Sequence, residues 1–239
     1  NPTAKTGVPD LSCRAAVQDA VPAAETPDSA ERGALLAAAF PALLAFYDRE
    51  RRHLPWREEP TPYRVWVSEI MLQQTRVEAV KPYFERFMRA LPDVYALAAC
   101  PPDTLHKLWE GLGYYSRVRN LQRAAELVVR DYGGELPRDP KTLLTLPGIG
   151  SYTAGAIAAF AYGVPAPAVD GNVLRVLARF FADGRNILDP RVKTDFEATV
   201  ADALLRGTPR PGDVGQALIE LGATVCTPTS PVCEKCPWH

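Results

Sequence analysis

From Ala34 onward, apolar residues recur at helical spacing in short segments separated by turn-forming connectors such as Gly133-Gly134. The alternating pattern of strands with hairpin turns is absent. The sequence therefore predicts an all-α fold. Residues 1–30 show no sustained apolar period, so we expect a flexible tail there. We expect helices over residues 35–46, 63–75, 82–90, 94–99, 103–111, 116–132, 141–146, 152–162, 172–181, 194–205 and 213–221.

The charge of the chain is nearly balanced. Its 239 residues include 27 lysines or arginines and 28 aspartates or glutamates, which argues against a strongly basic nucleic-acid-binding domain. A local basic face is still expected where Arg117, Arg119 and Arg123 follow one another without an intervening acid. No run of about 20 uncharged apolar residues predicts a membrane span, and no secretory signal peptide is visible. We expect a monomeric cytoplasmic protein with no membrane partner.

A glycine-rich turn lies between two predicted helices, in the string Leu146-Pro147-Gly148-Ile149-Gly150. Gly148 and Gly150 permit a tight turn with outward amide groups, which would suit a phosphate at the following helix N-terminus. A plain corner between two helices explains the same string. Beside the other motifs, it is similar to the helix-hairpin-helix element that grips the DNA backbone without reading sequence.

Two carboxylates suggest acid–base chemistry. Glu69 lies in residues 65–72, a mostly apolar stretch of the helix expected over 63–75, where burial would raise its pKa and suit a general acid near neutral pH. A place on a solvated face would leave Glu69 an ordinary surface residue. Asp170 precedes a predicted helix and fits an N-cap. The same position stabilises an ionised carboxylate, which could stabilise a positively charged sugar during glycosidic cleavage.

The five cysteines are an odd number, so a fully paired disulfide framework is not expected. Cys226, Cys233 and Cys236 are spaced like metal or cluster ligands near the C-terminus. Zinc or free buried thiols explain the same spacing, because three thiolates are not a closed tetrahedral set. Either His239 completes a Cys3His zinc site, or a fourth cysteine lies beyond the end of the sequence.

Together these strings resemble the helix-hairpin-helix DNA glycosylases, and among them most closely the MutY adenine DNA glycosylase family. The similarity runs from about Leu43 to the C-terminus and implies a fold of two all-α lobes with the active site between them. One lobe would comprise residues 55–162 with the hairpin, and the other residues 31–54 plus 163–239 with an iron-sulfur cluster loop. The resemblance is carried, in order, by residues 54–57, 68–75, 111–117, 146–156, 169–173 and 217–223.

The resemblance implies removal of adenine mispaired with 8-oxoguanine or guanine in double-stranded DNA, a base excision repair reaction that requires a flipped base. Glu69 matches the acid that protonates adenine N7, and Asp170 the carboxylate that stabilises the deoxyribose C1′. Tyr152 and Asn172 match residues that support this chemistry. Positions around the flipped adenine match Arg52, Leu54, Trp56, Arg57 and Glu220. Positions that insert into or grip the duplex match Gln74, Thr75, Tyr114, Gly148 and Gly150.

Tyr152 distinguishes members of this superfamily. Endonuclease III-like enzymes have a lysine there, which attacks C1′ and goes on to cut the strand, whereas a tyrosine cannot form a Schiff base. We therefore expect a monofunctional glycosylase. Thymine or uracil mismatch glycosylases also carry tyrosine there and are the alternative. An endonuclease III-like glycosylase and a non-catalytic DNA-binding module are further alternatives.

Two departures from the family pattern qualify the resemblance. The cysteine spacing fits the family's 4Fe-4S cluster motif, but the fourth cysteine ligand is missing from this sequence. MutY proteins usually continue into a C-terminal domain similar to Nudix hydrolases that helps to recognise 8-oxoguanine, and nothing here corresponds to it. We therefore expect a catalytic core with weaker discrimination of 8-oxoguanine from guanine.

Overall fold

The computed structural model describes residues 28–239, so residues 1–27 of the expected tail lie outside the described residues. Within residues 28–239 every regular element is a helix and no strand occurs, which confirms the all-α prediction. The elements are α1 Ser29–Glu50, α2 Pro55–Glu58, α3 Pro62–Leu72, α4 Val77–Ala90, α5 Val94–Ala98, α6 Pro102–Trp109, α7 Ser116–Tyr132, α8 Pro140–Leu143, α9 Ser151–Ala156, η2 Ile157–Ala161, α10 Gly171–Phe180, α11 Pro190–Leu205, α12 Pro211–Thr224 and η3 Cys233–Lys235.

Helix α1 begins earlier than its apolar pattern indicates. The Asp28 carboxylate accepts hydrogen bonds from the backbone N–H groups of Ala30 and Glu31, both at 2.8 Å, and so caps the helix. Ser29 and Ala30 therefore belong to the helix, although the expected tail includes them. Residues 28–33 contain no large apolar side chain, so the apolar pattern places the start of the helix near Ala34.

Apolar spacing does not predict two short elements, α2 and η3, nor the π-helical form of a third, η2. Helix α2 begins at Pro55, a favourable first helical residue, and only Trp56 of its four residues is buried. The 3-10 turn η3 begins at Cys233 and ends before Cys236. The π-helix η2 continues α9 and lies within the helix expected over residues 152–162. Helix α2 and η3 are too short to show a period of their own, and apolar spacing does not distinguish a π-helix from an α-helix.

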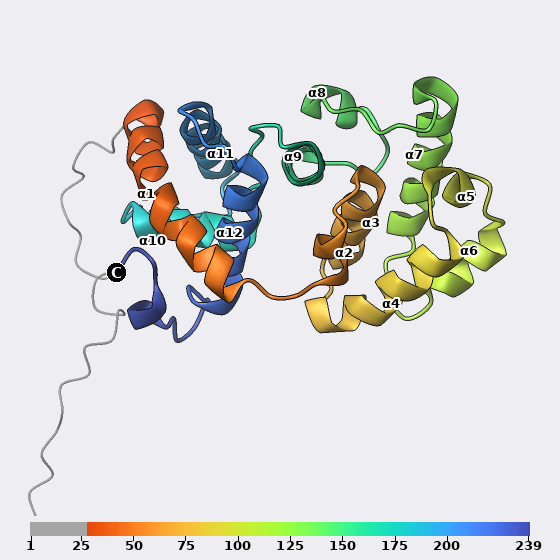
Figure 1. Ribbon diagram of the computed structural model, residues 1–239, viewed down its shortest axis with the longest axis horizontal. Coiled ribbons are helices and arrows are strands. Elements are labelled where there is room, and N and C mark those ends of the chain that lie inside the picture. Colours follow the sequence, from red (N-terminus) through yellow and green to blue (C-terminus); the bar gives the residue numbers. More distant parts are fainter. Residues whose placement is uncertain (1–27) are drawn as a thin grey trace, which may run out of the picture.

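Two hydrophobic clusters fill the described part of the chain, and Figure 1 shows their helices at opposite ends of the molecule. The first cluster extends from Leu54 to Ala166 and includes the fully buried Trp66 and Trp109. The second combines α1 with α10, α11 and α12, so it joins segments far apart in the sequence. The two-lobed division with the boundaries given above stays a prediction.

Helix α12 packs against both clusters, because it contacts α1 and α10 as well as η2. Gly212 permits the contact with η2, since a Cβ atom there would lie 2.4 Å from the Ala159 carbonyl oxygen. Near the other end of α12, a Cβ atom at Gly222 would lie 2.7 Å from the Asn172 Cβ. Two small residues therefore allow α12 to approach both the helix after the hairpin and the start of α10.

One described helix, α1, is long and apolar enough to cross a membrane, judged by length and composition alone. In the structure its Leu36, Phe40 and Leu43 side chains are buried in the second cluster. Packing in this core accounts for the apolar character of the helix.

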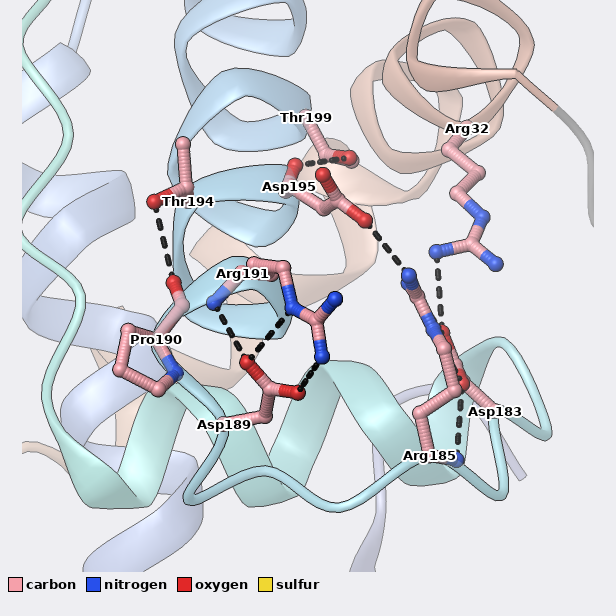
Figure 2. Close-up of polar contacts among 9 residues, drawn as sticks. All are labelled: Arg32, Asp183, Arg185, Asp189, Pro190, Arg191, Thr194, Asp195 and Thr199. Atoms are coloured by element: carbon pink, nitrogen blue, oxygen red, sulfur yellow. Dashed lines mark hydrogen bonds and ion pairs between the residues drawn. The ribbon is translucent and has the colours of Figure 1, made fainter.

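A buried ion pair connects the start of α1 to the segment between α10 and α11 (Figure 2). Arg32 donates to Asp183 at 3.0 Å, and their side chains are only 4% and 1% exposed. Arg185 donates to the same carboxylate at 2.8 Å and also pairs with Asp195 on α11. Burial opposes ionisation of Asp183, but the hydrogen bonds from Arg185 and Arg32 outweigh it and lower its pKa to about 2. The ion pairs thus hold three segments of the second cluster together.

We expect Arg32→Met to lower the free energy of unfolding by about 1–3 kcal/mol at neutral pH, because Asp183 stays buried with fewer donors. The pKa of Asp183 is lowered on folding, so its stabilisation is present above about pH 4 and is lost as pH falls toward 2. Urea unfolding measured against pH tests this. Arg130→Met is the control, since its pair with Asp131 is exposed and should not matter. Equal effects of the two variants would contradict the expectation.

Candidate active site

A pocket opens beside α3, α9 and α12, at the segment that leads from α1 into α2. It encloses about 530 Å³, counting the space that is open to solvent. The pocket lies where the two hydrophobic clusters meet, because its lining comes from both α3 and α12. Six of the residues selected from the sequence line it: Arg52, Leu54, Trp56, Arg57, Glu69 and Tyr152.

Glu69 is the buried acid of this pocket. Its helix, α3, buries side chains on most of its surface, and Glu69 itself is only 7% exposed. The pKa of Glu69 is raised to about 7, mainly by burial and in part by the charge of Asp170, while a hydrogen bond with Tyr152 and the charge of Arg57 oppose the rise. A carboxyl group in this setting is partly protonated at neutral pH and can act as a proton donor.

Tyr152 lies in the first turn of α9, directly after the hairpin, and lines the pocket beside Glu69. Burial raises the pKa of Tyr152 well above its usual value, and the charges of Glu69 and Asp170 act in the same direction. Its hydroxyl therefore stays protonated and can donate a hydrogen bond to the ionised Glu69 carboxylate. This bond favours the charged form of Glu69 and so sets a limit on how far burial raises its pKa.

Asp170 caps α10 and is held in place by two hydrogen bonds. Its Oδ1 accepts from the backbone N–H of Val173, and its Oδ2 accepts from Asn172 Nδ2, both at 2.8 Å. Asn172 Oδ1 accepts in turn from Arg175 at 2.8 Å. The N-cap prediction for Asp170 is confirmed. Because its charge influences Glu69 as well, the cap also places a second carboxylate beside the pocket.

Arg52 and Arg57, which line the pocket, form an ion cluster with Glu220, which lies behind them and is not part of the lining. Glu220, on α12, is fully buried and accepts from Arg52 Nε at 2.6 Å and from Arg57 at 2.9 Å. Burial disfavours its charge, but the two arginines outweigh this and lower the pKa of Glu220. Arg57 also donates to the Arg52 carbonyl at 3.2 Å. The cluster joins α12 to the segment before α2.

Sequence reasoning missed two polar residues of the pocket, Ser68 on α3 and Gln216 on α12. Gln216 lines it from α12, together with the apolar Phe160 and Ile219. Gln216 precedes Glu220 by four positions on the same helix, so the two residues share a face. Once Glu220 is chosen as a site residue, the spacing of four positions predicts that Gln216 lies on the same side of the helix.

The hairpin glycines lie outside the pocket. Gly148 has a positive φ of 79°, and the turn is closed by a hydrogen bond from the Ile149 N–H to the Leu146 carbonyl at 3.2 Å. Next to the turn, Ser151 donates to Glu197 on α11 at 3.0 Å. The hairpin is therefore bonded to a helix of the second cluster.

The residues expected to insert into the duplex also lie away from the pocket lining. Gln74 and Tyr114 occur in separate loops and are exposed, Tyr114 by 62%. Thr75 is partly buried in the same loop as Gln74. The prediction that Arg117 belongs to an exposed basic face with Arg119 and Arg123 is wrong. The Arg117 side chain turns inward and donates to backbone carbonyls. Apolar spacing predicts which face of a helix is buried. It does not predict that an arginine at the border of that face donates hydrogen bonds to carbonyls of other segments.

The C-terminal cysteines lie on the segment after α12. Cys226 and Cys236 pack beside the second cluster, and Arg179 donates to the Cys226 sulfur at 3.3 Å. Burial raises the pKa of Cys236, and Cys226 contributes to the rise. Within residues 28–239, however, no group of three or more histidine, cysteine, aspartate or glutamate side chains is arranged to hold a metal ion, with or without His239. The thiols as placed therefore do not fit a complete cluster or zinc site.

The two buried glutamates should respond oppositely to replacement. Because the folded-state pKa of Glu69 lies above its ordinary 4.5, native stability should fall by about 3 kcal/mol as pH rises from 4.5 past 7. Glu69→Gln should remove this fall. Glu220→Gln should instead destabilise the protein throughout pH 5–8, because it removes the charge that pairs Arg52 and Arg57. Urea unfolding against pH measures both, and an undiminished pH slope in Glu69→Gln would contradict the burial of Glu69.

The pattern of the HhH-GPD superfamily of base excision DNA repair proteins matches residues 67–201. Adenine DNA glycosylase from Mus musculus is 47% identical over 204 residues, covering 82% of this chain and 39% of that protein. The same-named protein from Mycolicibacterium smegmatis is 43% identical over 196 residues, covering 82% and 66%. The chain therefore spans about two fifths of the length of the mouse relative.

Solved structures resemble the fold over nearly its whole length. A thermostable thymine-DNA glycosylase superposes with a TM-score of 0.75 and 30% identity, covering 87% of this chain and 94% of that one. A trapped covalent intermediate of endonuclease III with DNA gives a TM-score of 0.69 and 25% identity, covering 86% and 93%. The family match includes the residues that carry Glu69, Tyr152 and Asp170, and it confirms the family predicted from the motifs. The chain belongs to the HhH-GPD superfamily of base excision DNA repair proteins.

Proposed function

We propose that this chain is a monofunctional DNA glycosylase that hydrolyses the N-glycosidic bond of adenine mispaired with 8-oxoguanine or guanine in double-stranded DNA. The observation that carries the proposal is the buried Glu69 carboxyl, with a pKa of about 7, at a pocket beside a second carboxylate, Asp170. The curated relatives named adenine DNA glycosylase support adenine as the base.

In this proposal Glu69 is the general acid. Adenine leaves poorly as an anion, so proton transfer from Glu69 to N7 lets the electron pair of the C1′–N9 bond move into a neutral leaving group. Burial keeps the Glu69 proton available near neutral pH. Tyr152 keeps its own proton and stabilises the carboxylate that remains after the transfer.

Asp170 stabilises the positive charge that develops at C1′ when the base leaves. Its hydrogen bonds with the Val173 N–H and Asn172 hold the carboxylate in one orientation, so little reorganisation is needed as the charge forms. Water then adds to C1′ and its proton passes to the Glu69 carboxylate, which restores the acid. The two carboxyl groups thus divide the work in the way that glycoside hydrolysis requires.

The pocket wall supports recognition of a flipped purine. Leu54 and Trp56 offer apolar surface to the faces of the base, and Arg52 and Arg57 offer donors at its edge. Glu220 fixes both arginines through hydrogen bonds, so their positions are set before a base enters. Flipping is required because the reacting bond is hidden inside the stacked duplex.

We further propose that the hairpin at Gly148 and Gly150 binds the DNA backbone and that Gln74, Thr75 and Tyr114 insert near the vacated base. Arg119 and Arg123 are exposed on α7 and are available to phosphates. The chain would act as a monomer on chromosomal DNA, in the nucleoid or the nucleus.

Thymine excision is the second candidate. The likeness to a thermostable thymine-DNA glycosylase favours it, since that structure covers nearly all of this fold. Tyr152 is compatible with both activities, because the proposed chemistry in each case is hydrolysis without a Schiff base.

A panel of duplexes decides between these activities. We expect single-turnover release of base from A:8-oxoguanine and A:G duplexes, with no release from T:G or thymine-glycol duplexes and no strand cut before alkali treatment. Glu69→Gln should lower the rate by at least about 100-fold, because the proton donor is lost, while DNA affinity is kept. Glu85→Gln, an exposed glutamate on α4, is the control. Release of thymine alone, or full activity of Glu69→Gln, would refute the proposal.

We also propose that the segment after α12 holds a 4Fe-4S cluster through Cys226, Cys233 and Cys236. The spacing of the cysteines and the Arg179 donor beside the Cys226 sulfur support it. Closing the site requires a fourth ligand and a rearrangement of this segment, and no catalytic step above depends on it. A bound cluster would supply a structural cross-link for the segment.

Metal analysis of the purified protein tests the cluster. We expect a brown protein that contains iron and acid-labile sulfide, and we expect Cys233→Ser to lose both. Cys100→Ser is the control, because Cys100 is buried in the first cluster, away from the C-terminal segment. One bound zinc without iron would favour the site completed by His239, and a protein without either metal would contradict both sites.

A further inference from the structure

Arg117, in the first turn of α7, turns its guanidinium into the molecule and bonds to two separate loops. The first is the 73–76 loop, between α3 and α4. Nη1 of Arg117 donates to the backbone carbonyls of Ile70 at 3.0 Å, Met71 at 3.1 Å and Gln73. Ile70 and Met71 lie in the last turn of α3, where carbonyls lack partners within the helix and a cation is favourable.

The second loop is the 110–115 loop, between α6 and α7. Nη2 of Arg117 donates to the carbonyls of Leu112 at 3.0 Å and Gly113 at 3.3 Å, and it reaches Thr75 Oγ1 at 3.5 Å. The guanidinium also lies over the Trp109 ring, 5.5 Å from its centroid. One planar group therefore bonds to both loops and rests on a buried aromatic side chain.

Each loop contains one residue in the left-handed region, Gln74 with φ 56° and Tyr114 with φ 48°. Such a conformation costs a residue other than glycine on the order of 1 kcal/mol and persists only when its surroundings hold it. Arg117 donates to the carbonyl immediately before each of them, on Gln73 and Gly113. The same guanidinium thus holds both strained turns.

The side chains of these two residues are not held by the core. Gln74 is exposed, and Tyr114 is 62% exposed with Arg117 5.5 Å from its ring centroid. Their positions therefore depend on their backbones. Arg117 bonds to both backbones, whereas Trp109 Nε1 donates to the Gly113 carbonyl of one loop alone, at 3.1 Å. The same arginine contacts α3 one residue after Glu69, through the Ile70 carbonyl.

We propose that Arg117 is a positioning residue that fixes Gln74 and Tyr114 at a set separation from each other and from Glu69, so that both enter the duplex while the target base is unstacked. This inference rests on the proposed glycosylase function. Arg117 itself contacts neither base nor phosphate. Its planar fork of donors bonds to several carbonyls at once, which a lysine ammonium cannot reproduce.

The test compares a stacked target with an unstacked one. Arg117→Lys keeps the charge and should slow single-turnover release of adenine from a fully paired A:G duplex by about 10-fold or more. The same variant should release adenine at the native rate from a duplex in which that adenine is bulged and needs no unstacking. Arg130→Lys, near the other end of the same helix and paired with the exposed Asp131, should leave both rates unchanged.

A mutant cycle tests whether Arg117 acts through the two loop residues. In a Gln74→Ala, Tyr114→Ala background, Arg117→Lys should slow the stacked substrate little further, because the residues it positions are gone. Equal slowing on stacked and bulged substrates, or full additivity in the cycle, would overturn the proposal. So would a native rate for Arg117→Lys on the paired duplex.

A second variant serves if Arg117→Lys does not fold. Gly113→Ala adds a methyl group into open space but strains a residue with φ 69°, so it disturbs one carbonyl acceptor of Arg117 and leaves the guanidinium in place. It should slow the release of adenine from the stacked substrate selectively, and equal slowing on the bulged substrate would overturn the proposal.

If the native protein releases no base, the proposed function fails. The fluorescence of 2-aminopurine at the target position then tests Arg117 alone, with reduced unstacking expected for Arg117→Lys.

Discussion

The desolvation of Glu69 is the physical constraint on which this site depends. A carboxyl group that must donate a proton near neutral pH needs an environment that penalises its charge, and α3 provides one by burying nearly all of its surface. The pocket that exposes Glu69 to a ligand exists because α12 approaches α3 and the segment before α2. The small residues Gly212 and Gly222 permit α12 to take that place.

A second buried glutamate, Glu220, lies behind two arginines of the pocket, and its pKa is shifted in the opposite direction. Glu220 is fully buried, yet two arginines favour its ionised form, and in return it fixes the orientation of both. Glu69 has only the Tyr152 hydroxyl and the more distant charge of Arg57 to oppose its desolvation. The number of positively charged or hydrogen-bonding partners, and not burial alone, therefore determines whether a buried glutamate is a proton donor or a permanently ionised group. With the two arginines beside it, Glu69 would stay ionised and could not donate a proton; without them, Glu220 would lose its charge and could not orient the arginines.

Much of the fold and of the candidate site can be predicted from the sequence, and the features that cannot be predicted have physical causes. Long amphipathic helices, the Asp170 cap and the apolar setting of Glu69 are local features, so their residues reveal them. Helix α2 is too short for a period to appear, and apolar spacing predicts a helix across η2 but not its π-helical form. The inward course of Arg117 depends on carbonyls from a helix and two loops that only the folded chain brings together. The cysteine spacing suggests ligands, but among the described residues the side chains do not gather as that spacing predicts.

The central claim is that Glu69 donates the proton, with a pKa set by burial and limited by Tyr152. The most direct measurement is the single-turnover rate of adenine release against pH, for the native protein and for Tyr152→Phe. The native rate should fall as pH rises through about 7, since the acid loses its proton there. Removing the hydroxyl removes a hydrogen bond that lowers the pKa of Glu69, so the fall should move to higher pH. A native rate that stays constant across pH 6–8, or a fall that moves to lower pH in Tyr152→Phe, would contradict the account.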